Sequence, residues 1–183
     1  MSTPIAASGT YTVDASHSRV GFVARHMMVS KVRGSFNDFV GSGVFDADNP
    51  AASTLSITIQ AASIDTRNAD RDAHLRSNDF FDMDAHPAVS FASTGVSPVD
   101  QSNFKVMGDL TLRGVTLPVT FDVEVSGNSK DPYGNIRLGL EGSTTINRKD
   151  WGLNWNAPLE TGGVVISEKI TLEFEISAIK NVE

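Results

Sequence analysis

The sequence predicts an all-β, antiparallel domain, and three observations support this prediction. Apolar and polar residues alternate with a period of two along most of the chain, turn sequences separate the alternating segments, and only one stretch has a helical pattern. A period of two puts successive side chains on opposite faces of a strand, so each strand has one apolar and one polar face. The length of 183 residues suits a single domain.

The N-terminal half of the chain contains five short alternating segments, which we interpret as strands. A polar loop at residues 45–50 lies between the third and the fourth segment. The apolar faces of the five segments consist of Tyr11 and Val13, of Val20, Phe22 and Ala24, of Val32 and Phe36, of Leu55, Ile57 and Ile59, and of Val89 and Phe91.

Residues 66–82 break the β pattern and predict a short helix. Either Thr66 or Asn68 can cap its N-terminus, where acidic residues of the first turn are favourable. Asp72 and Arg76 stand four residues apart, which is the favourable order for an ion pair along a helix. We expect a second short turn after this helix.

The C-terminal half contains four further alternating segments. A turn at residues 113–116 is short enough for a hairpin, and a turn at 131–135 contains both proline and glycine. An irregular piece at 147–158 holds Trp151 and Trp155. The apolar faces consist of Phe104, Val106, Leu110 and Leu112, of Val119, Phe121, Val123 and Val125, of Ile136, Leu138 and Leu140, and of Ile166, Ile170, Leu172, Phe174 and Ile176.

About eight strands of this kind leave apolar faces and unpaired edges to be covered. A sandwich of two sheets buries the faces but keeps the edges, whereas a closed barrel removes the edges as well. The alternation alone leaves both architectures open. The interior of an eight-stranded barrel is either filled by side chains or holds one small ligand.

Composition excludes several classes of function. The formal charge of −7 disfavours binding to nucleic acids and to anionic lipid headgroups, because both need a basic surface. Without cysteine the chain has no disulfide, no thiolate zinc site and no cysteine nucleophile. The four histidines show no metal-ligand spacing, so we expect no metal and no cofactor. We also expect no membrane span, because no apolar run approaches the roughly 18 residues needed.

The N-terminus has neither a basic region nor the apolar run of a signal peptide. We therefore expect a cytoplasmic protein.

Six blocks of sequence resemble the YceI-like family, in the order in which the family has them. The ordered set carries the resemblance, because each block alone is weak evidence. The blocks are YTVDASHS at 11–18, GFVARHMMVSKVRGSF at 21–36, SIDT at 63–66, RDAHLRSNDFFD at 71–82, GDLTLRGVT at 108–116 and NRKDWGL at 147–153.

This resemblance implies an antiparallel, lipocalin-like closed barrel with one or two short helices. We assign residues 11–180 to one YceI-like domain and expect residues 1–10 to form a flexible N-terminus. The resemblance also implies a homodimer and an isoprenoid ligand, such as a prenyl diphosphate or the tail of an isoprenoid quinone. Relatives are often exported to the periplasm, from which this chain departs by lacking a signal peptide.

The ligand would lie among inward-facing strand residues, since burying hydrocarbon is favourable by about 0.8 kcal/mol for each CH₂ group. For each of these residues the alternative is a place in an ordinary core. The candidates are Phe22, Phe36, Leu55, Ile57, Ile59, Phe91, Phe104, Val106, Leu110, Phe121, Val123, Leu138, Leu140, Leu172 and Phe174.

A polar headgroup would need hydrogen-bond donors at the mouth of the barrel. Arg25 and His26 end a predicted strand and are candidates, because a guanidinium binds diphosphate oxygens in bidentate fashion. His74, with the two arginines beside it on the predicted helix, forms a second candidate cluster, with the helix as a lid. The alternative for both clusters is solvated or self-paired side chains. Trp151 and Trp155 either gate the cavity or plug the end of the barrel.

We interpret the chain as a non-catalytic carrier of an isoprenoid-type lipid, with no catalytic residues. Asp14, Ser16 and His17 have the residue types of a catalytic triad, but neighbours on an extended strand would point to alternating faces. Two alternatives remain. One is a barrel with a filled core that acts as a structural or protein-interaction module, and the other is an unrecognised hydrolase or isomerase of isoprenoid lipids.

Overall fold

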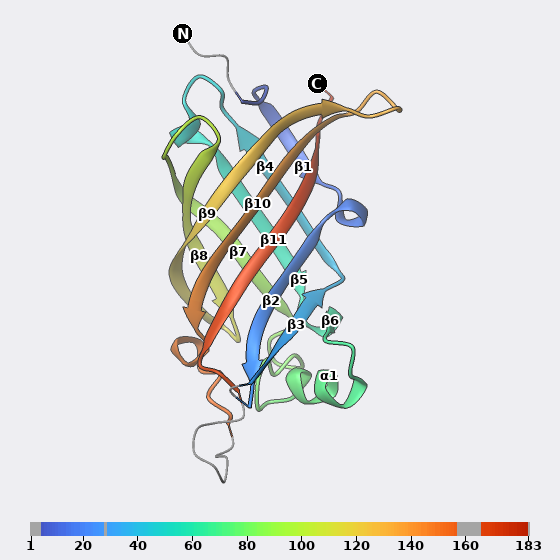
Figure 1. The fold of residues 1–183 in the computed structure, drawn as a ribbon, viewed down its shortest axis with the longest axis vertical. Coiled ribbons are helices and arrows are strands. Elements are labelled where there is room, and N and C mark those ends of the chain that lie inside the picture. The colour runs from blue at the N-terminus through green and yellow to red at the C-terminus, as the bar shows by residue number, and fades with distance from the viewer. Residues whose placement is uncertain (1–4, 28, 157–165, 183) are drawn as a thin grey trace.

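A single antiparallel sheet forms most of the molecule in the computed structural model, which describes residues 5–27, 29–156 and 166–182 (Figure 1). The strands are β1 (Gly9–Val13), β2 (Arg19–His26), β3 (Ser30–Phe36), β4 (Phe39–Phe45), β5 (Thr54–Gln60), β6 (Ile64–Asp65), β7 (Ala88–Pro98), β8 (Asn103–Leu112), β9 (Val115–Lys130), β10 (Ile136–Asn147) and β11 (Lys169–Lys180). The helices are α1 (Ala69–Arg76) and the 3₁₀ turns η1 (Ala15–His17), η2 (Pro50–Ala52), η3 (Ala61–Ser63) and η4 (Arg148–Trp151).

Pairing between the first and the last strand closes the sheet. Each strand of the ring β1-β4-β5-β7-β8-β9-β10-β11 is hydrogen-bonded to the next, and β11 returns to β1 through pairs such as Tyr11 with Lys180 and Val13 with Ala178. Eight strands therefore form a closed barrel, as predicted from the resemblance, and the sandwich alternative is wrong. Below this seam β11 pairs with β2 instead, so β2 and β3 continue the wall downward.

One strand of the ring was not predicted from the sequence. On β4 two of the three exposed positions are apolar, with Val40 69% exposed, and two of the inward positions are Gly41 and Gly43. A Cβ atom on Gly43 would lie 2.4 Å from the carbonyl oxygen of Thr54 on β5, so this wall leaves no room for a larger residue. The period of two is hidden in this segment, because glycine contributes no apolar side chain to the inner face.

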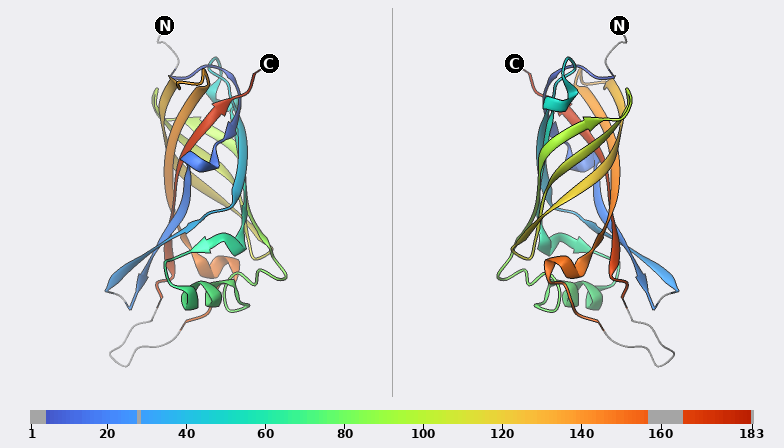
Figure 2. Two further views of the ribbon diagram at one scale, coloured as in Figure 1. Left: turned by 90° about the vertical axis from the view of Figure 1, so that its right-hand side faces the viewer. Right: turned by 90° about the vertical axis from the view of Figure 1, so that its left-hand side faces the viewer.

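Helix α1 lies across the lower end of the barrel, beside η4 (Figure 2). The side chain of Asn68 accepts a hydrogen bond from the backbone of Arg71, so Asn68, not Thr66, caps the helix. The predicted Asp72–Arg76 ion pair is wrong. Buried Asp72 instead accepts from the backbone and the hydroxyl of Thr66, while Arg76 donates to backbone carbonyls outside the helix.

Both termini lie at the upper end of the barrel (Figure 1). The described residues before Tyr11 contact the barrel there: Ala6 is buried, and β1 begins at Gly9. The hydroxyl of Tyr11 donates to the carbonyl of Ala7 at 2.8 Å, and the Ala7 backbone donates to the Asn128 side chain at 2.6 Å. The first four residues, and residues 157 and 158 of the predicted irregular piece, lie outside the described residues.

A network around Arg137 fastens the seam of the barrel from outside. The Arg137 guanidinium donates to Asp14 at 2.8 Å, beside the β1–β11 junction, and to Asp131 at 2.8 Å in the turn between β9 and β10. Hydrogen bonds from Ser16, Arg137 and His17 hold the pKa of Asp14 well below its ordinary value of 3.8. Asp14 also caps η1, so one carboxylate connects the chain reversal after β1 to strand β10.

This network predicts an acid-dependent loss of stability. Because the pKa of Asp14 is lower in the folded than in the unfolded state, its contribution is complete above about pH 4 and disappears as the pH falls through the folded pKa. We expect Asp14→Asn to lower the free energy of unfolding at neutral pH and to flatten its fall below about pH 4, as measured by urea denaturation over a pH series. Arg137→Gln should flatten the same region. Wild-type pH dependence in Asp14→Asn would contradict the assignment.

Candidate functional site

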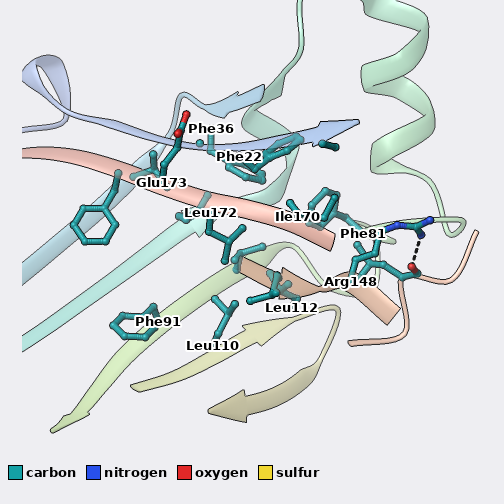
Figure 3. Close-up of a pocket in the computed structure, with 18 of the residues that line it drawn as sticks. Phe22, Phe36, Phe81, Phe91, Leu110, Leu112, Arg148, Ile170, Leu172 and Glu173 are labelled. Carbon is teal, nitrogen blue, oxygen red and sulfur yellow. Dashed lines mark hydrogen bonds between the residues drawn. The ribbon is translucent and has the colours of Figure 1, made fainter. Parts of the chain in front are cut away.

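The barrel encloses two apolar cavities. The lower cavity, of about 160 Å³, lies at the α1 end, and the upper cavity, of about 90 Å³, lies toward the termini. Figure 3 shows Phe91, Leu110, Leu112 and Leu172 pointing into the lower space from β7, β8 and β11. Among its lining residues only Arg148 and Glu173 are charged.

Every apolar strand residue that we named as a candidate to line a ligand lies on the wall of one of the two cavities. The lower cavity is lined by Phe22, Phe36, Leu55, Ile57, Ile59, Phe91, Leu110, Phe121, Leu172 and Phe174. The upper cavity is lined by Leu55, Phe104, Val106, Val123, Leu138 and Leu140. Leu55 is the one lining residue that the two cavities share, so they lie end to end along the barrel.

The predicted helix covers the lower cavity, but our site candidates did not include the apolar residues that close it. Leu75 of α1, followed by Phe80 and Phe81, lines its lower end together with Leu153. Phe80 and Phe81 are buried, although they lie in no strand. An apolar pair in an otherwise polar segment has to be buried against another element, and this could have located the cover over the barrel.

An aromatic layer crosses the barrel at the upper limit of the lower cavity. The rings of Phe91 and Phe121 have centroids 5.1 Å apart and are nearly perpendicular, and those of Phe121 and Phe174 are 5.4 Å apart. The next inward residues along β9 and β11, Val123 and Ile176, line the upper cavity. The three rings therefore stand at the boundary between the two cavities.

The outer ends of three phenylalanine rings lie against glycines of the adjacent strand. Cβ atoms built on Gly108 and Gly142 would come within 2.5 and 2.6 Å of the rings of Phe91 and Phe174. Lower in the barrel, a Cβ on Gly34 would lie 2.3 Å from the ring of Phe22, its direct cross-strand partner. These inward glycines let the rings lie close to the wall and keep the axis of the barrel open.

Arg148 is a buried cation at the lower end, and sequence reasoning missed it. Its side chain is 4% exposed and donates to the carbonyls of Ser167 at 2.9 Å, Leu153 at 2.5 Å and Ile166 at 3.4 Å. Burial lowers the pKa of its guanidinium. These bonds hold the chain after η4 and the chain before β11 together beneath the barrel.

The predicted polar mouth is not assembled around the cavities. Arg25, His26 and His74 line neither of them. Arg25 is exposed, and His26 pairs with Ser30 at the tip of the β2–β3 hairpin. His74 contacts Asp79 at 2.8 Å and packs against the rings of Phe80 and Trp155.

The arginines beside His74 donate to neighbouring groups of the chain itself. Arg71 bonds the hydroxyl and the carbonyl of Thr66, and Arg76 bonds the carbonyls of Ala62 and Ile64. This is the self-paired arrangement that the sequence left open.

The tryptophans also lie outside the cavity lining. Trp151 is buried and donates from its indole nitrogen to the carbonyl of Leu110 at 3.0 Å. Trp155 packs on His74 and Phe80, with its ring centroid 4.5 Å from that of His74. Their positions fit a plug at the barrel end better than a gate.

The residues with triad chemistry meet on η1, at the outer surface. His17 Nδ1 lies 2.8 Å from Asp14 Oδ2 and 3.1 Å from Ser16 Oγ. Our expectation that they point to alternating faces is wrong, because this segment is a 3₁₀ turn and not an extended strand. One imidazole nitrogen serves both partners, whereas a catalytic relay needs a different nitrogen for the nucleophile and for the carboxylate.

Within the described residues, the buried polar side chains form hydrogen bonds with the protein itself and need none from a ligand. In residues 5–27, 29–156 and 166–182, every buried side-chain nitrogen and oxygen has a hydrogen-bond partner, and no three His, Asp or Glu residues are grouped to hold a metal. Within the same ranges, no helix is long and apolar enough to span a bilayer. The chemistry of the cavities is therefore that of hydrocarbon.

Comparison with known proteins agrees with this architecture. The model of the YceI-like domain matches residues 11–178. A UPF0312 protein of Photorhabdus laumondii is 42% identical over 158 residues, which cover 86% of this chain and 81% of that protein.

Two solved structures share the fold. BcnA of Burkholderia cenocepacia superimposes with a TM-score of 0.80 at 24% identity, covering 90% of this chain and 98% of BcnA. A polyisoprenoid-binding domain from Saccharophagus degradans superimposes with a TM-score of 0.70 at 19% identity, covering 93% and 98% of the two chains. The family match and the relative in Photorhabdus show that this chain belongs to the YceI-like domain family.

Proposed function

We propose that the protein binds the isoprenoid tail of a lipid inside its barrel and carries it without changing it chemically. The observation that carries this proposal is the pair of end-to-end cavities, whose linings are almost wholly apolar. A prenyl chain or the tail of an isoprenoid quinone needs such a surface. It needs no directional bonds along its length.

The size of the cavities sets how a tail would be held. A cavity of about 150 Å³ takes one benzene-sized molecule, so the lower cavity, of about 160 Å³, accommodates one segment of a tail. The upper cavity adds about 90 Å³ beyond the aromatic layer. Each buried CH₂ group contributes about 0.8 kcal/mol, so a tail that enters both cavities binds more tightly than one confined to the first.

Two further observations support a non-catalytic carrier. The polyisoprenoid-binding domain from Saccharophagus degradans shares this fold. Acid–base catalysis needs a titratable group within hydrogen-bonding reach of the substrate. None of the four histidines, all of which are described, lines either cavity, and the carboxylate among the lining residues, Glu173, is paired with Arg19 at 2.9 Å. The homodimer and the cytoplasmic location that we expect from the sequence stay predictions.

We expect organic extraction of the protein purified from cells to release a lipid with an isoprenoid tail, detected by mass spectrometry of the extract and by native mass spectrometry of the complex. The lipid-free protein should then take up added prenyl alcohols and return them unaltered. A protein that carries no lipid and ignores added isoprenoids would favour the filled-barrel alternative. Turnover of prenyl esters or diphosphates would favour the enzyme.

We expect Gly34→Ala to weaken binding of prenyl alcohols by about tenfold or more, because the new methyl group pushes the ring of Phe22 into the lower cavity. The loss should appear in titrations of the lipid-free protein. Ser35→Ala, on the opposite face of the same strand, is the matched control and should bind like the wild type. Equal affinities for Gly34→Ala and the control would mean that the ligand does not pass Phe22.

A further inference from the structure

The boundary between the two cavities has a regular construction. Around one side of the barrel, inward positions alternate between large and small: Phe91 on β7, Gly108 on β8, Phe121 on β9, Gly142 on β10 and Phe174 on β11. Below this level the lining residues belong to the lower cavity, and above it to the upper cavity. The alternation therefore forms a partition across the lumen.

The three rings of the partition are not equivalent. Phe91 and Phe174 each lie over a glycine, so their outer ring atoms occupy the space that a Cβ would otherwise fill. Phe121 does not lie over any described glycine. Its ring centroid lies 5.1 Å from that of Phe91 and 5.4 Å from that of Phe174. Phe121 therefore stands between two rings that are already withdrawn against the wall.

We propose that Phe121 determines how long a tail the barrel accepts. This inference rests on the proposed function, because it concerns a tail that enters from the lower cavity. A short tail fills the lower cavity and ends at the partition. A longer tail must displace the Phe121 ring before its end reaches the upper cavity, and this displacement opposes the favourable burial of the additional carbon atoms.

Truncation of Phe121 joins the two cavities and should shift the preference toward longer ligands. The test measures the affinity of lipid-free wild-type protein for geraniol, farnesol and geranylgeraniol, by competition against a fluorescent farnesol analogue. We expect Phe121→Ala to raise the affinity for geranylgeraniol relative to geraniol by at least about tenfold, since each further buried CH₂ group strengthens binding. Phe121→Leu should shift the same ratio in the same direction by a smaller factor, and it keeps the test available if the alanine variant does not fold.

Phe39→Ala is the matched control. It makes the same truncation at a buried phenylalanine of β4 that lines neither cavity, and it leaves the three rings of the partition in place. We expect its ratio of affinities to equal that of the wild type. An equal shift in Phe39→Ala and Phe121→Ala, or no shift in either Phe121 variant, would overturn the inference while leaving lipid binding intact. A wild-type protein that binds none of the three alcohols would overturn the proposed function and this inference together.

Discussion

Closure of the sheet between β1 and β11 is the constraint on which the rest of the structure depends. Three residue pairs, from Tyr11–Lys180 to Val13–Ala178, make that junction, and one backbone hydrogen bond extends it on either side, from Asn181 to Thr10 and from Asp14 to Ser177. Without it, β1 and β11 would each expose a row of unpaired backbone groups, and the inner faces would not meet around a common space. The junction is short, and this explains why the polar network of Arg137, Asp14 and Asp131 lies beside it. The network fixes the chain reversal after β1 from outside, where it does not intrude on the apolar lumen.

Closure also determines what can lie inside. Inward positions converge on the axis, so an eight-stranded barrel lined only with large residues would be filled. In this barrel large and small residues alternate at the level of the aromatic layer, and each glycine receives a ring from the adjacent strand. The rings thus cover backbone that would otherwise be bare, and the space they vacate lies along the axis. A hollow interior follows from the arrangement of a few residues and not from a shortage of apolar side chains.

The sequence predicted the fold well where a period of two could be seen, and the fifteen apolar strand candidates all lie on the cavity walls. It failed at β4, where inward glycines removed the alternation, and at Arg148, whose burial depends on carbonyls of a chain segment distant in sequence. Arg25, His26 and His74 were attractive by residue type alone. Their positions relative to the lumen depend on where the β2–β3 hairpin and α1 end, and the alternation of apolar and polar residues does not predict these end points. Closure itself came from the family resemblance, because sandwich and barrel share one pattern.

The inward glycines indicate that the interior of the barrel favours space for a ligand over the maximal stability of the fold. Glycine in a strand weakens it, because it loses more backbone entropy on folding and has no side chain to pack. A barrel that needed only a solid core would gain from β-branched residues at Gly34, Gly108 and Gly142, since such residues fill a pleated surface well. Phenylalanine beside glycine instead gives a wall that is smooth, apolar and thin. A flexible hydrocarbon can lie against such a wall in many conformations, so it loses less entropy on binding than it would in a pocket that fixed each of its carbon atoms.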